Sequence, residues 1–251
     1  MPNETLGAFS MAWVALTSCS RRVNFCLGTF LKQTHSVIGA MQTNAYAPEW
    51  RDSIYIGLSV GMDRIVDRQS MVCRWDMGYT KLQGTFTRFA LPITWDYCEG
   101  NPFSDATGNY MANLEWVAEY WEHAMLASFQ APSPHAKHCS ALVKQETTFD
   151  LVITDPPYYD AIGYAVLMDF FYVWLRRALN GLSPEFDAAF CEELSPKWDH
   201  DRNDGELIDD ASRHGDDKVK SKAAYEKGME QAFLTCSAIL NNDGRGTAQG
   251  G

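Results

Sequence analysis

The chain has 251 residues, and 46% of them are hydrophobic. This proportion is ordinary for globular proteins and excludes a disordered chain as the first interpretation. The 32 acidic and 21 basic residues give a formal net charge of −11. Because this surplus of negative charge disfavours nonspecific adhesion to nucleic acid, composition alone argues against DNA binding.

The start of the chain lacks the charge order of a signal peptide. Residues 6–19 are apolar, but Glu4 precedes them, no basic residue does, and Arg21 and Arg22 follow. Seven scattered cysteines without a Cys-x-x-Cys pair favour reduced thiols. No apolar run approaches the length of a membrane span. We therefore expect a cytoplasmic protein without a membrane partner.

The first part of the chain is predicted to be mainly helical. Residues 1–43 indicate one or two helices without defined ends. Over residues 44–70, apolar side chains recur at helical spacing after Pro48, which is tolerated in a first helical turn. Residues 71–103 show no period and indicate either a structured connection whose aromatic side chains fill the core, the favoured interpretation, or a binding loop. Residues 109–127 predict a further helix.

Residues 128–148 form a link to the second part of the chain. It contains His135, His138 and Cys139, whose side chains are able to bind a metal ion. No second cluster at ligand spacing completes a set of four donors, so we expect no metal site.

The centre of the sequence is a short apolar run that stops at two prolines. Residues 149–154 predict a strand, and the following Asp155-Pro156-Pro157-Tyr158 stretch lacks two backbone donors and has two fixed φ angles. The loop is therefore stiff. It presents a carboxylate beside an aromatic ring at the carboxyl end of a strand, where α/β sheets bind ligands. The alternative is a structural turn capped by Asp155.

A helix is predicted after this loop, with apolar residues from Tyr164 to Ala178 on one face and Asn180-Gly181 as its stop. Residues 185–217 include twelve acidic residues and indicate a solvated, partly mobile loop. The last helix is predicted over residues 216–240. An Asn-Asp-Gly turn and a Gly-rich tail follow it, and no strand is expected there, so the predicted sheet lacks its next strand.

The loop carries groups suited to the methylation of an amine on a nucleobase. Such a nitrogen is a poor nucleophile because its lone pair is delocalised into the ring. The Asp155 carboxylate and the Pro156 carbonyl are able to accept its two N–H bonds and aim the lone pair at a methyl donor. Tyr158 would stack on the base, at about 1–3 kcal/mol, and Tyr159 would add a second surface.

These residues resemble a known family. Thr154-Asp155-Pro156-Pro157-Tyr158 is similar to the catalytic motif of the amino-methyltransferases, which transfer a methyl group from S-adenosylmethionine to adenine N6 or cytosine N4 of DNA. The longer run to Asp160 resembles one branch, the large prokaryotic adenine-specific DNA methylases that carry a conserved domain of unknown function. Further stretches between about residues 46 and 244 match this branch: Cys73-Arg74-Trp75-Asp76, Leu91 to Phe103, Leu114-Glu115-Trp116-Val117, Tyr164-Ala165, Asp169 to Arg177, Arg213-His214-Gly215 and Gly228-Met229.

The resemblance implies a Rossmann-like methyltransferase sheet, S-adenosylmethionine as cofactor and DNA as substrate. It assigns catalysis to Asp155, Pro156, Pro157 and Tyr158, substrate binding to Tyr158, Tyr159 and Asp160, and a cofactor contact to Asp155. Two positions depart from the family pattern and would alter the edge of the target pocket: Val166 stands where an Asp is usual, and Gly163 replaces a common Pro.

The glycine-rich cofactor turn of the family is not found, because the stretch from Tyr55 to Gly61 lies within a helical pattern. We therefore expect a fragment of a longer methylase with an α/β fold and an incomplete Rossmann-like sheet. In this interpretation, residues 1–140 are a mainly helical segment with aromatic-rich loops, and residues 141–251 are part of the catalytic domain. A second polypeptide would then supply the missing cofactor-binding half.

Three functions stay open on the sequence. The first is methylation of adenine in DNA. The second is methylation of a different amine, such as RNA guanine or a protein glutamine amide. The third is a non-catalytic remnant or partner subunit of such a methylase. We expect weak or absent activity for the chain in isolation.

Overall fold

The computed structural model describes residues 21–86, 95–132, 134–137, 139–143, 146–158, 164–190, 198–199 and 204–248. The chain divides into two compact units. The helical unit comprises Phe9–His135 and Met168–Leu194, and the strand unit comprises Met1–Ala8, Ala136–Leu167 and Ser195–Gly251. Within the described residues the structure combines helices with short two-stranded sheets, which is compatible with an α/β fold.

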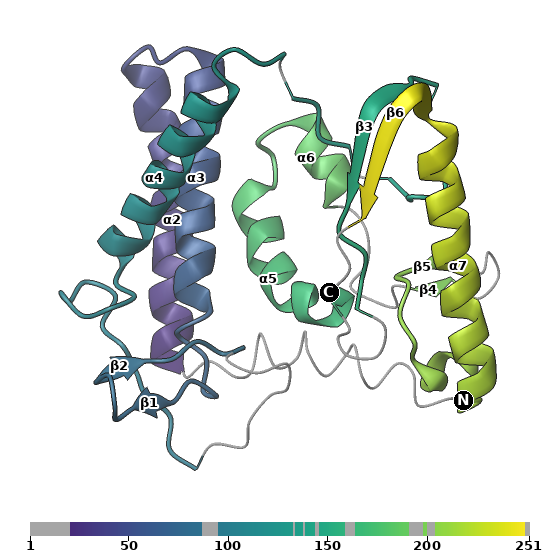
Figure 1. Ribbon diagram of the computed structural model, residues 1–251. Coiled ribbons are helices and arrows are strands. Elements are labelled where there is room, and N and C mark those ends of the chain that lie inside the picture. Colours follow the sequence, from purple (N-terminus) through teal and green to yellow (C-terminus); the bar gives the residue numbers. More distant parts are fainter. Residues whose placement is uncertain are drawn as a thin grey trace. The chain divides into compact units, whose positions relative to one another are not determined.

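The helical unit is built on three long helices (Figure 1): α2 (Arg21–Thr43), α3 (Pro48–Val66) and α4 (Tyr110–Ser128). The predicted helices over residues 44–70 and 109–127 are confirmed, and Pro48 occupies the first turn of α3 as expected. Asn109 caps α4, because its side chain accepts a hydrogen bond from the backbone N–H of Ala112 at 2.8 Å.

Helices α3 and α4 approach closely at two glycines. A Cβ atom at Gly57 would overlap the indole of Trp121, and one at Gly61 would overlap the side chain of Leu114. The Tyr55–Gly61 stretch is therefore helical, as predicted, and its glycines provide room for a neighbouring helix.

The same unit contains most of α5 (Tyr164–Leu179) and the short α6 (Pro184–Ala189). The predicted helix after the proline loop is confirmed, and Gly181 follows it with φ of 78°, a conformation that glycine adopts at low cost. The core of this unit gathers apolar side chains from α2, α3 and α5. Its fully buried members include Leu27, Tyr55, Met62, Ile65, Val66 and Phe170.

The connection between α3 and α4 contains a small hairpin of β1 (Trp75–Asp76) and β2 (Lys81–Leu82). The favoured interpretation, in which its aromatic side chains fill the core, is wrong for several of them. Trp75 is half exposed, and Trp95 is 96% exposed. Small polar residues are buried in this connection instead. The hydroxyls of Ser70 and Thr85 form a hydrogen bond of 2.8 Å beside the buried thiol of Cys73.

The strand unit contains the predicted central strand as β3 (Phe149–Thr154). It also contains β4 (Trp198–Asp199), β5 (Asp204–Gly205), the short 3-10 helix η1 (Ala211–His214), α7 (Lys218–Ala238) and β6 (Leu240–Ala248). The predicted last helix is confirmed as α7, and its N-terminus is capped by the Asp217 carboxylate.

The expectation that no strand follows α7 is wrong. Strand β6 pairs with β3 in parallel (Figure 1), and Leu151 to Thr154 lie opposite Arg245 to Ala248. The register shifts between Phe149 and Leu151, so residues 241–244 bulge out before regular pairing starts. Asn, Asp and Gly have low β propensity, so the sequence did not indicate a strand here. Pairing with β3 supplies the backbone hydrogen bonds and outweighs this low propensity.

Candidate functional site

The Asp155-Pro156-Pro157-Tyr158 loop leaves β3 at the carboxyl edge of the β3–β6 sheet. Thr154 is the last residue of β3 and lies opposite Ala248, the last residue of β6. Parallel sheets bind ligands at this edge. Asp155 and Tyr158 are exposed, Tyr158 at 49%, whereas the two prolines are half-buried. Tyr159 and Asp160 lie outside the described residues.

Helix α7 holds this loop by one buried side chain. The hydroxyl of Tyr225 donates a hydrogen bond to the carbonyl oxygen of Pro157 at 2.7 Å, and Tyr225 is only 8% exposed. Sequence analysis did not single out Tyr225. The available signal was the residue type, since a buried tyrosine needs a partner for its hydroxyl.

A second tyrosine lies beside the loop. The ring centroids of Tyr158 and Tyr164 are 6.4 Å apart, and the two planes are tilted by 53°. Partial desolvation raises the pKa of Tyr164, and Tyr158, Asp155 and Glu206 raise it further. Those influences place Tyr164 in an acidic setting that includes Glu206, a residue sequence analysis did not single out.

Glu206 belongs to an acidic segment, residues 204–217, whose side chains make defined contacts, so the solvated loop predicted for residues 185–217 is wrong for this part of it. Arg213 donates to the Glu206 carboxylate at 3.0 Å and to its backbone carbonyl at 2.9 Å. Its Nε atom also lies 3.5 Å from the Asp210 carboxylate. One arginine therefore folds the segment back on itself.

The same segment packs on α7. A Cβ atom at Gly228 would overlap the side chain of Leu207, so this glycine allows the close approach. The hydroxyl of Ser221 also donates to the Asp209 carboxylate. Sequence analysis singled out Arg213 and Gly228 only as residues that match the methylase branch, and it did not predict these contacts, because they depend on how the segment packs on α7.

The loop presents acceptors and aromatic surface. The Asp155 carboxylate and the Pro156 carbonyl are acceptors suited to N–H groups, and the two tyrosine rings suit a flat molecule. Among the residues that the structure describes, no three His, Cys, Asp or Glu side chains gather closely enough to hold a metal ion. The helices of this part of the chain are also too short or too polar to span a membrane.

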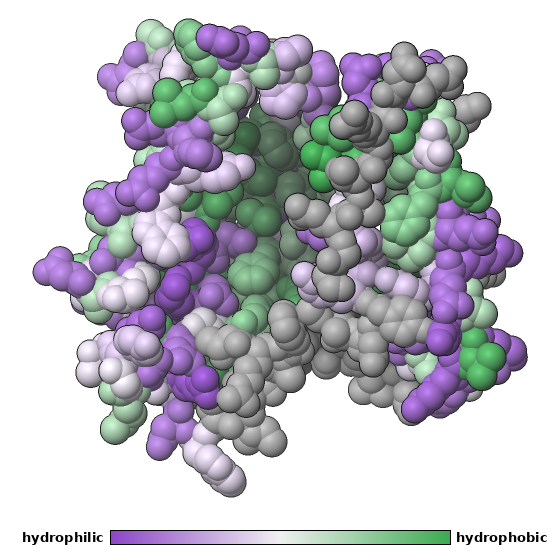
Figure 2. All heavy atoms as spheres, in the orientation of Figure 1, coloured by the Kyte–Doolittle hydropathy of each residue, from purple (hydrophilic) through white to green (hydrophobic). Residues whose placement is uncertain are grey.

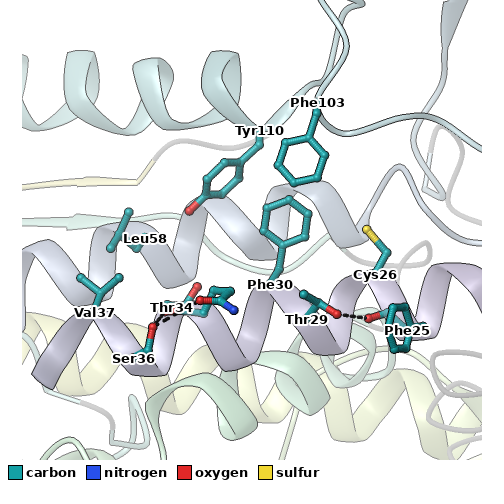
Figure 3. A pocket seen from close by; sticks show the side chains of 11 residues that line it. Phe25, Cys26, Thr29, Phe30, Thr34, Ser36, Val37, Leu58, Phe103 and Tyr110 are labelled. Carbon is teal, nitrogen blue, oxygen red and sulfur yellow. Dashed lines mark hydrogen bonds between the residues drawn. The ribbon is translucent and has the colours of Figure 1, made fainter. Parts of the chain in front are cut away.

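A pocket of about 490 Å³ lies elsewhere, in the helical unit (Figure 3). The ring of Phe30 faces those of Phe103 and Tyr110, with centroids 5.1 and 4.9 Å away. The hydroxyl of Thr29 donates to the carbonyl of Phe25 at 2.8 Å and is occupied. Burial raises the pKa of the Cys26 thiol. The lining of this pocket, as far as the described residues form it, is mainly apolar and includes no carboxylate.

Comparisons with models of protein families, with curated proteins and with solved structures give no match for this chain.

Proposed function

We propose that the chain carries the target-amine site of an S-adenosylmethionine-dependent methyltransferase that acts on adenine N6 in DNA, within a Rossmann-like sheet. The observation that supports it most is the exposure of Asp155 and Tyr158 at the carboxyl edge of β3. Here both groups are accessible to a ligand.

The chain's own residues have distinct roles in this proposal. The Asp155 carboxylate and the Pro156 carbonyl accept the two N–H bonds of the amine, which holds the nitrogen lone pair toward the methyl donor. Tyr158 stacks on the base. S-adenosylmethionine supplies an electrophilic methyl group when bound. Because nitrogen loses a proton after it attacks, the exposed Asp155 carboxylate would also pass that proton to water.

A second candidate, a subunit completed by another polypeptide, is favoured by the surface of β3. Leu151 is 51% exposed and Ile153 is 68% exposed. Strands of parallel sheets are ordinarily covered on both faces and read as continuous apolar runs. A partner that supplies further strands and the cofactor-binding half would cover these side chains.

The test is transfer of a tritium-labelled methyl group from S-adenosylmethionine to DNA, RNA and protein, each offered separately to the purified chain. Because the chain in isolation is expected to be weakly active, a low level of label recovered as N6-methyladenine in DNA is the expected result. Asp155→Asn should lower the rate at least tenfold, because a charge-assisted hydrogen bond contributes about 1.5–3 kcal/mol. The exposed Glu146→Gln variant removes the same charge in the same unit and should retain the rate.

The other outcomes separate the alternatives. Label found only in RNA or protein would favour the different-amine function. No label in any acceptor, together with no heat of S-adenosylmethionine binding in calorimetry, would overturn the enzymatic proposal and favour the subunit.

A further inference from the structure

The apolar pocket of the helical unit contains two hydroxyl groups that have no partner in the described chain. Thr34 of α2 lines this pocket and is only 4% exposed, but its hydroxyl makes no hydrogen bond to a described residue. The same holds for the hydroxyl of Tyr110, the first residue of α4. Figure 3 shows the side chain of Tyr110 directed toward α2. Because buried polar groups are ordinarily hydrogen-bonded, these two hydroxyls need an explanation.

Other hydroxyls of α2 bond to their own helix, which makes Thr34 an exception. Thr29 donates to a carbonyl in the preceding turn at 2.8 Å, and Ser36 does so at 2.7 Å. This bond to the preceding turn is a common arrangement for Ser and Thr within a helix. Thr34 instead keeps its hydroxyl available on the wall of the pocket, as Tyr110 does from α4.

The remaining wall of the pocket offers aromatic and aliphatic surface. Phe30 stacks on Phe103, with ring centroids 5.1 Å apart and planes 19° from parallel. Phe25 and Phe103 are 79% and 75% exposed, so their ring surfaces are accessible. The volume of about 490 Å³ falls within the range of pockets that bind small organic molecules. The pocket therefore suits a flat, mainly apolar ligand.

The charge of the lining excludes an ionic ligand. None of the lining residues within the described part of the chain carries a charged side chain. An ion in this pocket would lose its hydration without gaining a counter-charge, which is costly. Water is also a poor occupant of most of the pocket, because a buried water molecule needs several polar partners.

We propose that this pocket binds an uncharged aromatic molecule that carries a hydroxyl group, which forms hydrogen bonds with Thr34 and Tyr110. A hydroxyl both donates and accepts, so one ligand oxygen is able to pair with two protein hydroxyls. Burial raises the pKa of Tyr110, so its hydroxyl keeps its proton at neutral pH. The proposal does not depend on methyl transfer, because the pocket and the Asp155–Tyr158 loop belong to different units.

The experiment measures the dissociation constants of three probes for the full chain by ligand-observed NMR. The probes are 2-naphthol, naphthalene, which lacks the hydroxyl, and 2-naphthoate, which carries a negative charge. The wild-type chain should bind 2-naphthol most tightly, and 2-naphthoate at least about tenfold more weakly, because the pocket offers no counter-charge. Undetectable binding of 2-naphthol, or equal or tighter binding of either other probe, would overturn the proposal.

Two variants remove the hydroxyls and preserve the shape of the pocket wall. Thr34→Val and Tyr110→Phe should each weaken 2-naphthol binding about 2- to 12-fold, because each variant loses one hydrogen bond to the ligand. Both variants should leave naphthalene binding unchanged, since naphthalene makes no such bond. Thermal unfolding checks that the variants fold, and the comparison of the three probes on the wild-type chain decides the proposal if they do not.

The matched controls are Thr43→Val, whose hydroxyl bonds to the Gly39 carbonyl at 2.9 Å, and Tyr120→Phe at an exposed position of α4. Neither residue is among those described in the pocket lining, so both controls should bind 2-naphthol like the wild type. An equal loss of naphthalene and 2-naphthol binding in the Thr34 and Tyr110 variants would overturn the proposal by showing only a change in pocket shape. Unchanged 2-naphthol binding in both variants would overturn it as well.

Discussion

The hydroxyl of Tyr225 donates a hydrogen bond to the carbonyl oxygen of Pro157 at 2.7 Å, and this bond joins α7 to the candidate loop. The prolines already fix two φ angles of the loop. The buried hydroxyl of Tyr225 fixes the direction of the Pro157 carbonyl. The loop is therefore positioned by its own chain geometry and by a helix more than sixty residues later in the sequence.

We expect Tyr225→Phe to lower methyl transfer several-fold without abolishing it. The substitution keeps the buried ring but leaves the Pro157 carbonyl without this donor, which costs on the order of 1 kcal/mol. The measurement is kcat and KM for DNA, with thermal unfolding as the check on folding. Tyr120→Phe, at an exposed position of α4, is the matched control. Unchanged kinetics in Tyr225→Phe would show that this bond does not position the loop.

Tyr158→Ala should raise KM for DNA between about 5-fold and 150-fold, because base stacking is worth about 1–3 kcal/mol. Tyr158→Phe keeps the ring and should stay close to wild type. Steady-state kinetics of both variants separate the ring from the hydroxyl. An equal loss in the two variants would contradict stacking as the function of this side chain.

Gly57→Ala and Gly61→Ala should each destabilise the helical unit by about 1–3 kcal/mol, because the added methyl groups would force Trp121 and Leu114 away from α3. Gly28→Ala and Gly39→Ala are the controls within α2, since nothing lies within 4 Å of an added Cβ at either position. These controls should stabilise by about 0.5–1 kcal/mol. Denaturant unfolding measures all four, and a loss of stability in the controls would contradict the packing argument.

Stability should fall as the pH rises from about 4 to 8, owing to Asp63 of α3. Burial, and then the negative charge of Asp67, raise the pKa of this carboxyl to about 8. Its Oδ1 atom is buried and has no hydrogen-bond partner among the described residues. The folded chain therefore keeps a proton that the unfolded chain releases near pH 4, so folding becomes less favourable until the pH passes the folded pKa.

Asp63→Asn should remove this dependence and exceed the wild type in stability by a few kcal/mol near pH 8.5, with little difference near pH 4. The measurement is the unfolding free energy from urea titrations at several pH values. Asp105→Asn removes an exposed carboxylate of the same unit and serves as the control. A wild-type stability that does not decline between these pH values would refute the burial of a protonated Asp63.

Local sequence patterns predicted α3, α4, α5, α7 and β3, because helical spacing and a short apolar run each depend on neighbouring residues alone. Strand β6 was missed because its backbone is satisfied by β3, a partner about ninety residues earlier. The contribution of Tyr225 was missed for the same reason. Within the candidate site, the positions of Asp155 and Tyr158 follow from the proline turn, whereas those of Glu206 and Arg213 depend on packing against α7.

Because the register shifts at the start of β6, the number of residues there does not determine how the rest of β6 aligns with β3. Residues 241–244 bulge out between the pairing of Phe149 with Leu240 and that of Leu151 with Arg245. Extra residues in this bulge would lengthen it without sliding the pairs nearest Asp155. The bulge is thus a suitable place for a short tag or a spectroscopic probe, which would report on the sheet while leaving the loop geometry intact.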